Sequence, residues 1–190
     1  MLDHAAQSGR HPLAERGNDL YETPVEATRA LLDAVPLPSR IWEPACGRGA
    51  IVNVLRAAGH EVVASDLIDY GIPITAPGYW GVDFLREREA PKGTQAIVTN
   101  PPYALATQFA EHAVDLVPEV FLLLRLAFLE SARRTDLLEH RGLHRVLIFR
   151  KRLPMMHRDG WSGPRASSAI PFAWFCWRRG YESPAAIVRI

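Results

Sequence analysis

Short apolar runs alternate with helical patterns from residue 40 onward, and this alternation is the feature that most constrains the fold. Residues 40–45 and 61–65 have the composition of buried strands, and residues 49–58 between them have a helical pattern that Gly59 closes. A strand, a helix and a second strand in this order form a parallel βαβ unit. The chain therefore predicts an α/β domain whose mostly parallel, twisted sheet carries helices on both faces.

The other expected elements continue the same alternation. Thr23, Pro24 and Glu26 form a helix-start signature, with Thr23 as the cap and Pro24 in the first helical position. Residues 1–17 are polar and poorly patterned, which predicts a disordered N-terminal tail. Beyond the βαβ unit we expect strands at residues 82–84, 96–99, 120–126, 145–150 and 172–178, and helices at residues 24–34, 104–116 and 129–140.

Length and cysteine content narrow the class of protein. A chain of 190 residues that is 48% hydrophobic can fill one domain but is short for two, so we expect a single domain over residues 18–190. Cys46 and Cys176 lie far apart without metal-ligand spacing, which predicts a reduced, cytoplasmic protein with no metal site. We find no signal-peptide pattern and no apolar stretch as long as a membrane span.

The formal net charge of +1 conceals an asymmetry along the chain. Residues 1–132 carry 10 basic and 17 acidic side chains, whereas residues 133–179 carry 11 basic and 3 acidic ones. Arginines clustered with aromatic residues such as Trp161 and Phe172 favour contact with nucleic-acid phosphates and bases. The alternative is a solvated surface whose charges are balanced in space by the acidic part of the chain.

The tetrapeptide Asn100-Pro101-Pro102-Tyr103 directly follows a predicted buried strand. Each proline restricts its own φ and the conformation of the preceding residue, so carbonyl groups in this turn are aimed at little entropic cost. The Asn100 side-chain oxygen and the Pro101 carbonyl can accept both hydrogens of one amino group, and Tyr103 offers a face for stacking. Such a turn is suited to orienting a planar amine. The simpler interpretation is that two prolines end a strand.

The strand ends before this turn also carry unusual residues. The turn at residues 43–49 contains two glycines that let a ligand approach the backbone closely. Asp66 follows the next strand, 20 residues beyond Cys46, at a spacing typical of an acid that binds ribose hydroxyls. Asp83 and Phe84 then offer a carboxylate and a ring face for an adenine. Each acid alone is more often a turn residue, but ligands bind beyond the carboxyl ends of such strands, and the serial placement favours a ligand site.

Phosphate binding fits the first of these turns less well. The full Gly-x-Gly-x-x-Gly pattern is absent, and the carboxylate of Glu43 would repel a pyrophosphate. An acid at this place favours a cationic ligand instead, and S-adenosylmethionine is a cation of that kind.

The chain resembles the S-adenosylmethionine-dependent methyltransferases that modify adenine N6 in DNA, above all the small phage and prophage members, in residues 21–24, 43–49, 66, 83–84 and 100–103. The resemblance covers residues 18–130, with a weaker likeness at residues 174–177. It implies a Rossmann-like class I methyltransferase fold with a C-terminal antiparallel strand pair. The Asn-Pro-Pro-Tyr motif is shared with enzymes that methylate protein glutamines or exocyclic amines in RNA, so it indicates chemistry more than substrate.

The resemblance implies direct methyl transfer from S-adenosylmethionine to a base flipped out of its duplex, without a covalent enzyme intermediate. Cys46 is then a packing residue rather than a nucleophile. The implied catalytic residues are Asn100 and Pro101, which hold the amine, with Pro102 and Tyr103, which stacks on the base. The implied cofactor contacts are Thr23 and Pro24 near the methionine end, Glu43 at the amino group, Asp66 at the ribose, and Asp83 with Phe84 at the adenine. Ala45, Cys46 and Gly47 belong to the floor, and Tyr21, Leu67 and Asn100 complete the set.

We expect the chain, unlike many members of that family, to have no separate target-recognition domain. Specificity is then expected from residues 71–81 and 150–168, although both stretches also suit plain loops. For Arg125 we expect a structural ion pair with an acid such as Glu130, with a phosphate contact as the alternative. The expected nucleic-acid contacts are Arg150, Lys151, Arg152, Arg158, Trp161 and Arg165.

The expected activity is methylation of adenine N6 in double-stranded DNA by a soluble protein that needs neither metal nor membrane. Methylation of RNA adenine or of protein glutamine is the alternative within the same chemistry. A nucleic-acid-binding module that has lost its activity is the alternative outside it, although the intact Asn100 to Tyr103 motif disfavours it. The sequence does not indicate an oligomeric state.

Overall fold

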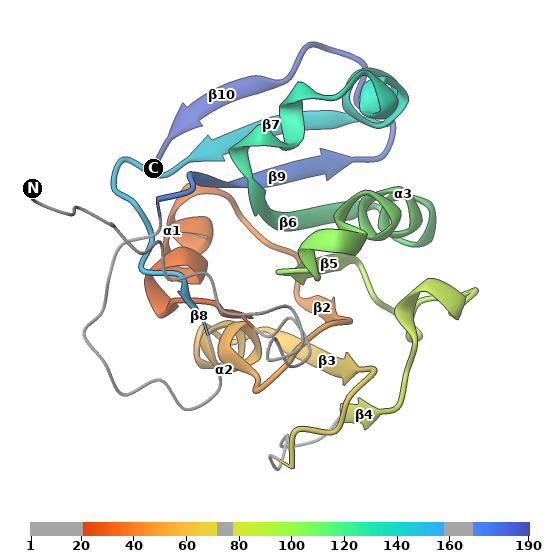
Figure 1. The fold of residues 1–190 in the computed structure, drawn as a ribbon. Helices are drawn as coiled ribbons and strands as arrows, with labels where there is room; N and C mark the ends of the chain where they lie inside the picture. The colour runs from red at the N-terminus through yellow and green to blue at the C-terminus, as the bar shows by residue number, and fades with distance from the viewer. Residues whose placement is uncertain (1–20, 72–77, 158–168) are drawn as a thin grey trace, which may run out of the picture.

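The computed structural model describes residues 21–71, 78–157 and 169–190, and the centre of this part is one mixed, twisted sheet (Figure 1). Its strands are β2 (Arg40–Glu43), β3 (Glu61–Asp66), β4 (Gly78–Trp80), β5 (Ala96–Thr99), β6 (Glu119–Arg125), β7 (Leu143–Ile148), β9 (Phe172–Arg178) and β10 (Ala186–Arg189). Their order across the sheet is β10-β7-β9-β6-β5-β2-β3-β4. A separate two-stranded sheet pairs β1 (Tyr21–Glu22) with β8 (Met156–His157).

Every neighbouring pair in the large sheet is parallel except the two pairs that β9 makes with β6 and β7. This arrangement confirms the expected mostly parallel sheet with antiparallel pairing near the C-terminus. Because the other strands run in one direction, their carboxyl ends meet at one edge of the sheet, which we call the carboxyl edge. It carries the residues that end β2, β3, β5, β6 and β7.

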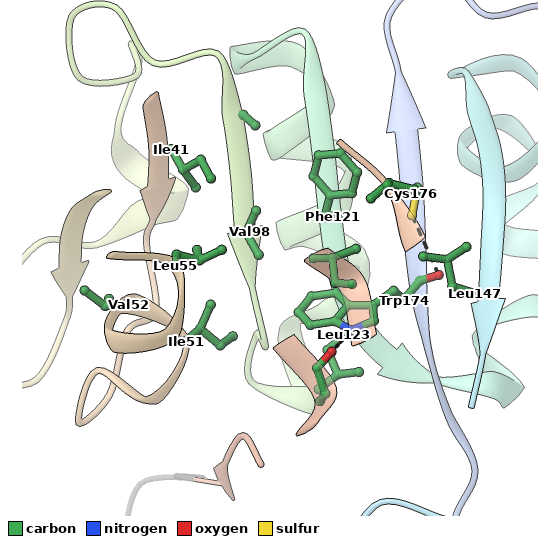
Figure 2. Packing of buried hydrophobic residues seen from close by; sticks show 14 of the residues in the cluster. Ile41, Ile51, Val52, Leu55, Val98, Phe121, Leu123, Leu147, Trp174 and Cys176 are labelled. Atoms are coloured by element: carbon green, nitrogen blue, oxygen red, sulfur yellow. Dashed lines mark hydrogen bonds between the residues drawn. The ribbon is translucent and has the colours of Figure 1, made fainter. Parts of the chain in front are cut away.

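Helices cover both faces of the sheet, as expected. The helices α1 (Val25–Ala34) and α2 (Ala50–Ala57) pack on one face, and α3 (Ala106–Leu116) packs on the other together with a π-helical turn at Asp136–His140. Figure 2 shows the first face, where Ile51 and Leu55 of α2 lie among sheet residues such as Val98. The strongly apolar strands thus read as continuous hydrophobic runs because both of their faces are buried.

The strand β9 shows how one sequence serves both faces. Successive side chains of a strand point to opposite sides, so Trp174 faces α1 whereas Trp177 faces the π-helical turn. The Trp174 indole donates a hydrogen bond to the Ala27 carbonyl (2.8 Å), and the Trp177 indole donates one to the Leu137 carbonyl (3.0 Å). Each tryptophan therefore buries a large apolar surface and anchors a helical segment to the sheet.

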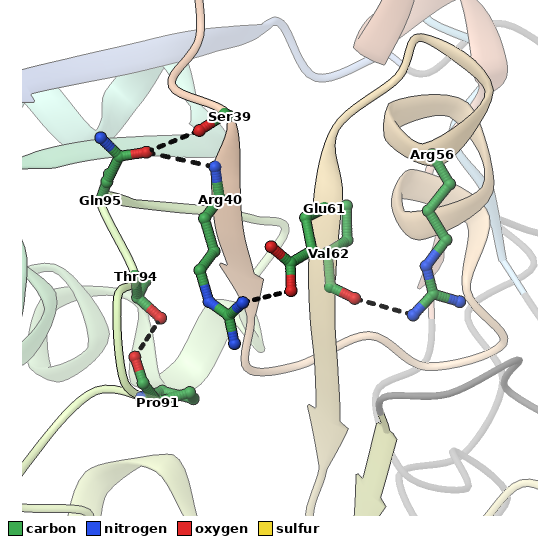
Figure 3. Close-up of polar contacts among 8 residues, drawn as sticks. All are labelled: Ser39, Arg40, Arg56, Glu61, Val62, Pro91, Thr94 and Gln95. Carbon is green, nitrogen blue, oxygen red and sulfur yellow. Dashed lines mark hydrogen bonds and ion pairs between the residues drawn. The ribbon is translucent and has the colours of Figure 1, made fainter.

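Polar contacts hold the strands together at the edge opposite the carboxyl edge (Figure 3). The side-chain oxygen of Gln95 accepts a hydrogen bond from the Arg40 backbone (3.3 Å), and the Arg40 guanidinium pairs with Glu61. Arg56 of α2 donates to the Val62 carbonyl (2.8 Å). These contacts join the starts of β2, β3 and β5, whose far ends carry the unusual motifs.

Two expectations about local structure near residues 23 and 83 are wrong. The helix α1 begins at Val25 with Pro24 as its N-cap and without a side-chain cap, and the Thr23 hydroxyl accepts a hydrogen bond from the Asn100 amide (3.1 Å). Residues 82–84 form no strand, since Asp83 caps a 3₁₀ turn at Phe84–Arg86. The third parallel strand is β4, which lies inside the stretch 71–81, where no strand was expected.

The expected helix at residues 129–140 is also wrong. That stretch contains 3₁₀ turns at Leu126–Glu130 and Ala132–Arg134 before the π-helical turn. The Ser131 hydroxyl accepts from the Arg133 backbone (3.3 Å), and this local bond competes with a continuous helix. Strands β1, β8 and β10 were not expected, because they are short and their partners lie far away in sequence. The predicted tail at residues 1–17 lies outside the described residues.

Gly142, directly before β7, has no room for a side chain. A Cβ atom there would lie 2.3 Å from the Arg178 carbonyl oxygen, and the residue has φ +81°. Gly180 has a similar φ of +76°, but a Cβ atom would meet nothing within 4 Å in the described part. We expect Gly142→Ala to reduce the free energy of unfolding by about 2 kcal/mol more than Gly180→Ala, which carries only the positive-φ penalty. Urea unfolding measures both, and equal losses would contradict the clash.

Candidate active site

A cavity of about 250 Å³ lies at the carboxyl edge, where the segments after β2, β3 and β5 meet. It brings together most of the residues that the sequence singles out: Thr23, Glu43, Ala45, Cys46, Gly47, Asp66, Leu67, Asp83, Phe84, Asn100, Pro101 and Pro102. Pro24 and Tyr103 are not part of its wall. Tyr21 belongs to β1, where its backbone pairs with β8. Its side chain lies outside the described part.

The floor of the cavity is the turn between β2 and α2. Gly47 and Gly49 have φ of 51° and 79°, a left-handed conformation that glycine adopts without steric cost. The Cys46 backbone donates to the Ser65 carbonyl (3.0 Å), and the Gly47 backbone donates to the Asp66 carboxylate (2.8 Å). The turn is therefore fixed to the end of β3, with its backbone facing the cavity.

Glu43 ends β2 inside the cavity wall and is only 2% exposed. Burial raises the pKa of its carboxyl well above the ordinary value of 4.5, and the nearby Asp66 charge adds to the shift, while a hydrogen bond with the Val52 backbone opposes it. Among the described residues, nothing hydrogen-bonds to its Oε2 atom. An unsatisfied buried carboxylate is suited to a cationic partner, which would restore its charged form.

The charged residues of the cavity wall are mainly acidic. They are Glu22, Glu43, Asp66 and Asp83, with Arg48 as the basic member. Burial also raises the pKa of Asp66, although backbone hydrogen bonds from Ile68 and Gly47 oppose the shift. A cavity of this composition attracts positive charge.

Asp66 and Phe84 contribute to the structure of the site as well as to its wall. The Asp66 oxygens accept hydrogen bonds from Gly47 (2.8 Å) and Ile68 (3.0 Å), but a carboxylate has about four acceptor positions, so hydroxyl groups can still bind. The Phe84 ring is 2% exposed and contacts Trp42 (5.2 Å between centroids) and Phe109 (4.7 Å). Roles at the ribose and the adenine therefore stay predictions for both residues.

The turn after β5 brings Asn100, Pro101 and Pro102 into the wall of the cavity. The Asn100 amide nitrogen donates a hydrogen bond to the Thr23 hydroxyl (3.1 Å). This bond distinguishes the nitrogen of the amide from its oxygen. The amide oxygen is then the atom that would accept a hydrogen from a target amine. Tyr103 begins a 3₁₀ turn at Tyr103–Leu105, beside the cavity.

The Cys46 thiol is buried in the floor of the cavity. Burial raises its pKa, and the neighbouring Glu43 and Asp66 carboxylates raise it further. Since the thiolate is the nucleophilic form of cysteine, this environment disfavours a covalent role. The geometry agrees with the interpretation of Cys46 as a packing residue.

Sequence reasoning missed several residues of the cavity wall. Leu67, which was expected to contact the cofactor, is 60% exposed. Leu105, which was not expected at the site, is also exposed. Three wall residues lie inside the motifs but were assigned no contact of their own, namely Glu22, Pro44 and Arg48. The missed residues follow or flank the motifs, so proximity to the motifs was their signal: Ala50, Ile51, Ile68, Tyr70, Val82, Leu85, Leu105 and Phe109.

The expected nucleic-acid contacts are only partly within the described residues. Arg150, Lys151 and Arg152 follow β7 at the carboxyl edge and are exposed, while Arg158, Trp161 and Arg165 lie outside the described part. The expected ion pair of Arg125 with Glu130 is wrong. The Arg125 guanidinium instead lies over the Tyr103 ring, with its carbon 4.3 Å from the ring centroid.

No protein-family model and no curated protein sequence matches the chain. Solved structures match it well. A protein assigned as an RNA methyltransferase from Pyrococcus horikoshii aligns with a TM-score of 0.61 and 13% identity, over 84% of this chain and 86% of that chain. The Mtq2–Trm112 complex of E. cuniculi, which methylates the termination factor eRF1, aligns with a TM-score of 0.59 and 17% identity, over 85% and 99%.

The chain has the Rossmann-like fold of class I methyltransferases. A third structure, assigned as the modification subunit of a type I restriction enzyme from Vibrio vulnificus, aligns with a TM-score of 0.59 and 14% identity. The alignment spans 90% of this chain and 47% of that subunit. At these identities the likeness establishes the methyltransferase fold, and the cavity at its carboxyl edge occupies the place where such sheets bind ligands.

Within the described residues, no group of three or more histidine, cysteine, aspartate or glutamate side chains could hold a metal ion. No helix in the same part of the chain is long and apolar enough to cross a membrane.

Proposed function

We propose that the protein is an S-adenosylmethionine-dependent methyltransferase that modifies an exocyclic amine, most specifically adenine N6 in double-stranded DNA. One observation carries the proposal: the acceptor turn at Asn100 to Pro102 and the acidic turn at Glu43 line the same cavity. A methyl donor and an amine can therefore meet without a large movement of the chain.

The residues of the cavity fit S-adenosylmethionine. The buried Glu43 carboxyl, whose Oε2 has no hydrogen-bond partner in the described part of the chain, would bind the cofactor's amino group. Asp66 would accept hydroxyls of the ribose, and Asp83 with Phe84 would border the adenine. When bound, the cofactor supplies an electrophilic methyl group on a sulfonium.

The acceptor turn would orient the target amine by hydrogen bonding. The Asn100 amide oxygen and the Pro101 carbonyl would accept the two amine hydrogens, so that the nitrogen lone pair points toward the methyl group. The Thr23 hydroxyl would keep the Asn100 amide in the required orientation. This role requires only positioned acceptors and no strong base.

Nucleic acid is supported as the substrate by the exposed Arg150, Lys151 and Arg152 at the carboxyl edge. Solved structures of the same fold include proteins named as acting on RNA and on a protein factor, so those substrates are the alternatives.

Transfer of label from S-adenosylmethionine tests the proposal. Wild-type protein would be incubated with methyl-labelled cofactor and, in parallel, with unmethylated duplex DNA, unmethylated RNA and a cell protein extract. We expect label in DNA, recovered as N6-methyladenine after digestion. Label in RNA or protein alone would contradict the substrate, and absence of cofactor binding in calorimetry would contradict the whole proposal.

A further inference from the structure

Arg125 and Tyr103 form a contact at the carboxyl edge that the proposed chemistry leaves unexplained. The guanidinium carbon of Arg125 lies 4.3 Å from the centroid of the Tyr103 ring. Phe172 also contacts that ring, with 5.7 Å between centroids and 42° between planes. Arg125 is exposed, whereas Tyr103 is half-buried. A cation therefore covers one face of the aromatic residue in the acceptor turn.

The backbone of Arg125 is firmly placed. It is the last residue of β6 and lies opposite Phe172 in the antiparallel pairing with β9. The next residue, Leu126, donates a backbone hydrogen bond to the Pro171 carbonyl (2.9 Å). The long side chain can change rotamer while these contacts keep its Cα atom beside Tyr103.

Arg125 also differs from three arginines that lie on or beside the sheet and form ion pairs. Arg40 pairs with Glu61, Arg141 with Asp115, and Arg178 with Glu119. Within the described ranges, Arg125 forms no ion pair, and its guanidinium contacts the Tyr103 ring. A planar cation that stacks on a ring and is not fixed by an ion pair within the described ranges is available to a second flat partner, and bases stack on guanidinium planes as they do on aromatic rings.

We propose that Arg125 is the movable second face of the slot that binds the target base. On entry of the base, the guanidinium lifts from the Tyr103 ring and stacks on the opposite face of the base, which then lies between Tyr103 and Arg125. The inference rests on the proposed function, because it assigns a residue to the same base-binding step. In this role Arg125 contacts the substrate, and its side chain must be planar as well as charged.

Arg125→Lys and Arg125→Ala test the inference against a simple phosphate contact. Lysine keeps the charge but loses the plane, so both variants should lose about tenfold in kcat/KM for DNA, as expected from base-stacking contributions. The dependence of KM on salt should stay as in wild type for Arg125→Lys, because its charge is retained. Arg178→Lys, which changes an arginine paired with Glu119 at the other end of β6 and β9, is the matched control and should keep wild-type rates.

Each result has a definite meaning. Wild-type kcat/KM in Arg125→Lys combined with a loss in Arg125→Ala would indicate a phosphate contact and overturn the inference, as would wild-type rates in both variants. Cofactor affinity and thermal midpoint, measured for every variant, should equal those of wild type, so that a folding defect is recognised. Wild-type protein that binds the cofactor but methylates no nucleic acid would instead contradict the proposed function, and with it the base-binding slot.

Discussion

Asn100→Ala is expected to lower methyl transfer by about a thousandfold, the scale seen when a preorganised hydrogen-bonding group is removed from an active site. The Asn100 amide is half-buried in the cavity wall, and its nitrogen is bound to the Thr23 hydroxyl at 3.1 Å. Alanine removes the acceptor oxygen and leaves the target amine without its orienting partner. Cofactor affinity should change little, because Glu43 and Asp66 remain.

The assay is single-turnover transfer of label to DNA, with cofactor affinity measured separately by calorimetry. Thr23→Val supplies an internal comparison, because it removes the hydroxyl that orients the Asn100 amide but keeps the amide itself. Its rate should fall between those of wild type and Asn100→Ala. Transfer by Asn100→Ala at more than about a tenth of the wild-type rate would refute the role of this amide as amine acceptor.

Glu43→Gln is expected to act on binding and on stability in opposite directions. Loss of the negative charge should weaken S-adenosylmethionine binding by about a hundredfold, the scale for removing one partner of a buried charge pair. The ligand-free protein should become more stable by about 1 kcal/mol near pH 8, because a buried carboxylate that is incompletely hydrogen-bonded is removed. Few substitutions outside a ligand site have this combination of effects.

The pH dependence follows from the raised pKa of Glu43. A carboxyl whose pKa is higher in the folded than in the unfolded state binds more protons when folded, so its contribution to stability is complete below the ordinary value of 4.5 and is lost as the pH rises toward the folded value. The contribution of Glu43 to the stability of the ligand-free wild type should therefore decline as pH increases above 4.5. Glu43→Gln should reduce this decline.

Urea unfolding across a pH series measures the effect, with calorimetry for cofactor affinity. Glu61→Gln is the matched control, since Glu61 lies at the exposed start of β3 and pairs with Arg40. It should change neither cofactor affinity nor the pH dependence appreciably. Equal pH dependence in wild type and Glu43→Gln would mean that this carboxyl is not the group destabilised by burial.

The sequence predicted the long, strongly patterned elements because their apolar periodicity reflects burial directly. The strands β2, β3, β5, β6 and β9 and the helices α1, α2 and α3 all occur close to their expected positions. The wrong predictions fall where local bonding competes with periodicity. Asp83 caps a 3₁₀ turn in place of a strand, and Ser131 interrupts the expected helix.

The sequence alone also determined which residues would gather at one ligand site. Each motif directly follows a strand, and parallel strands end at the same edge, so Glu43, Asp66 and Asn100 meet there. The sequence also predicted the local conformation of two turns. Two glycines permit the left-handed backbone of the first turn, and two prolines restrict the backbone of the other.

Only the tertiary structure decided which contacts these residues make. The Asn100–Thr23 bond spans 77 positions of sequence, and the Arg125–Tyr103 contact depends on the placement of β6 beside β5. Short strands such as β8 and β10 exist because distant partners complete their hydrogen bonds. Periodicity reports whether a side chain is buried, but a specific partner is set by the three-dimensional path of the whole chain, which no local pattern contains.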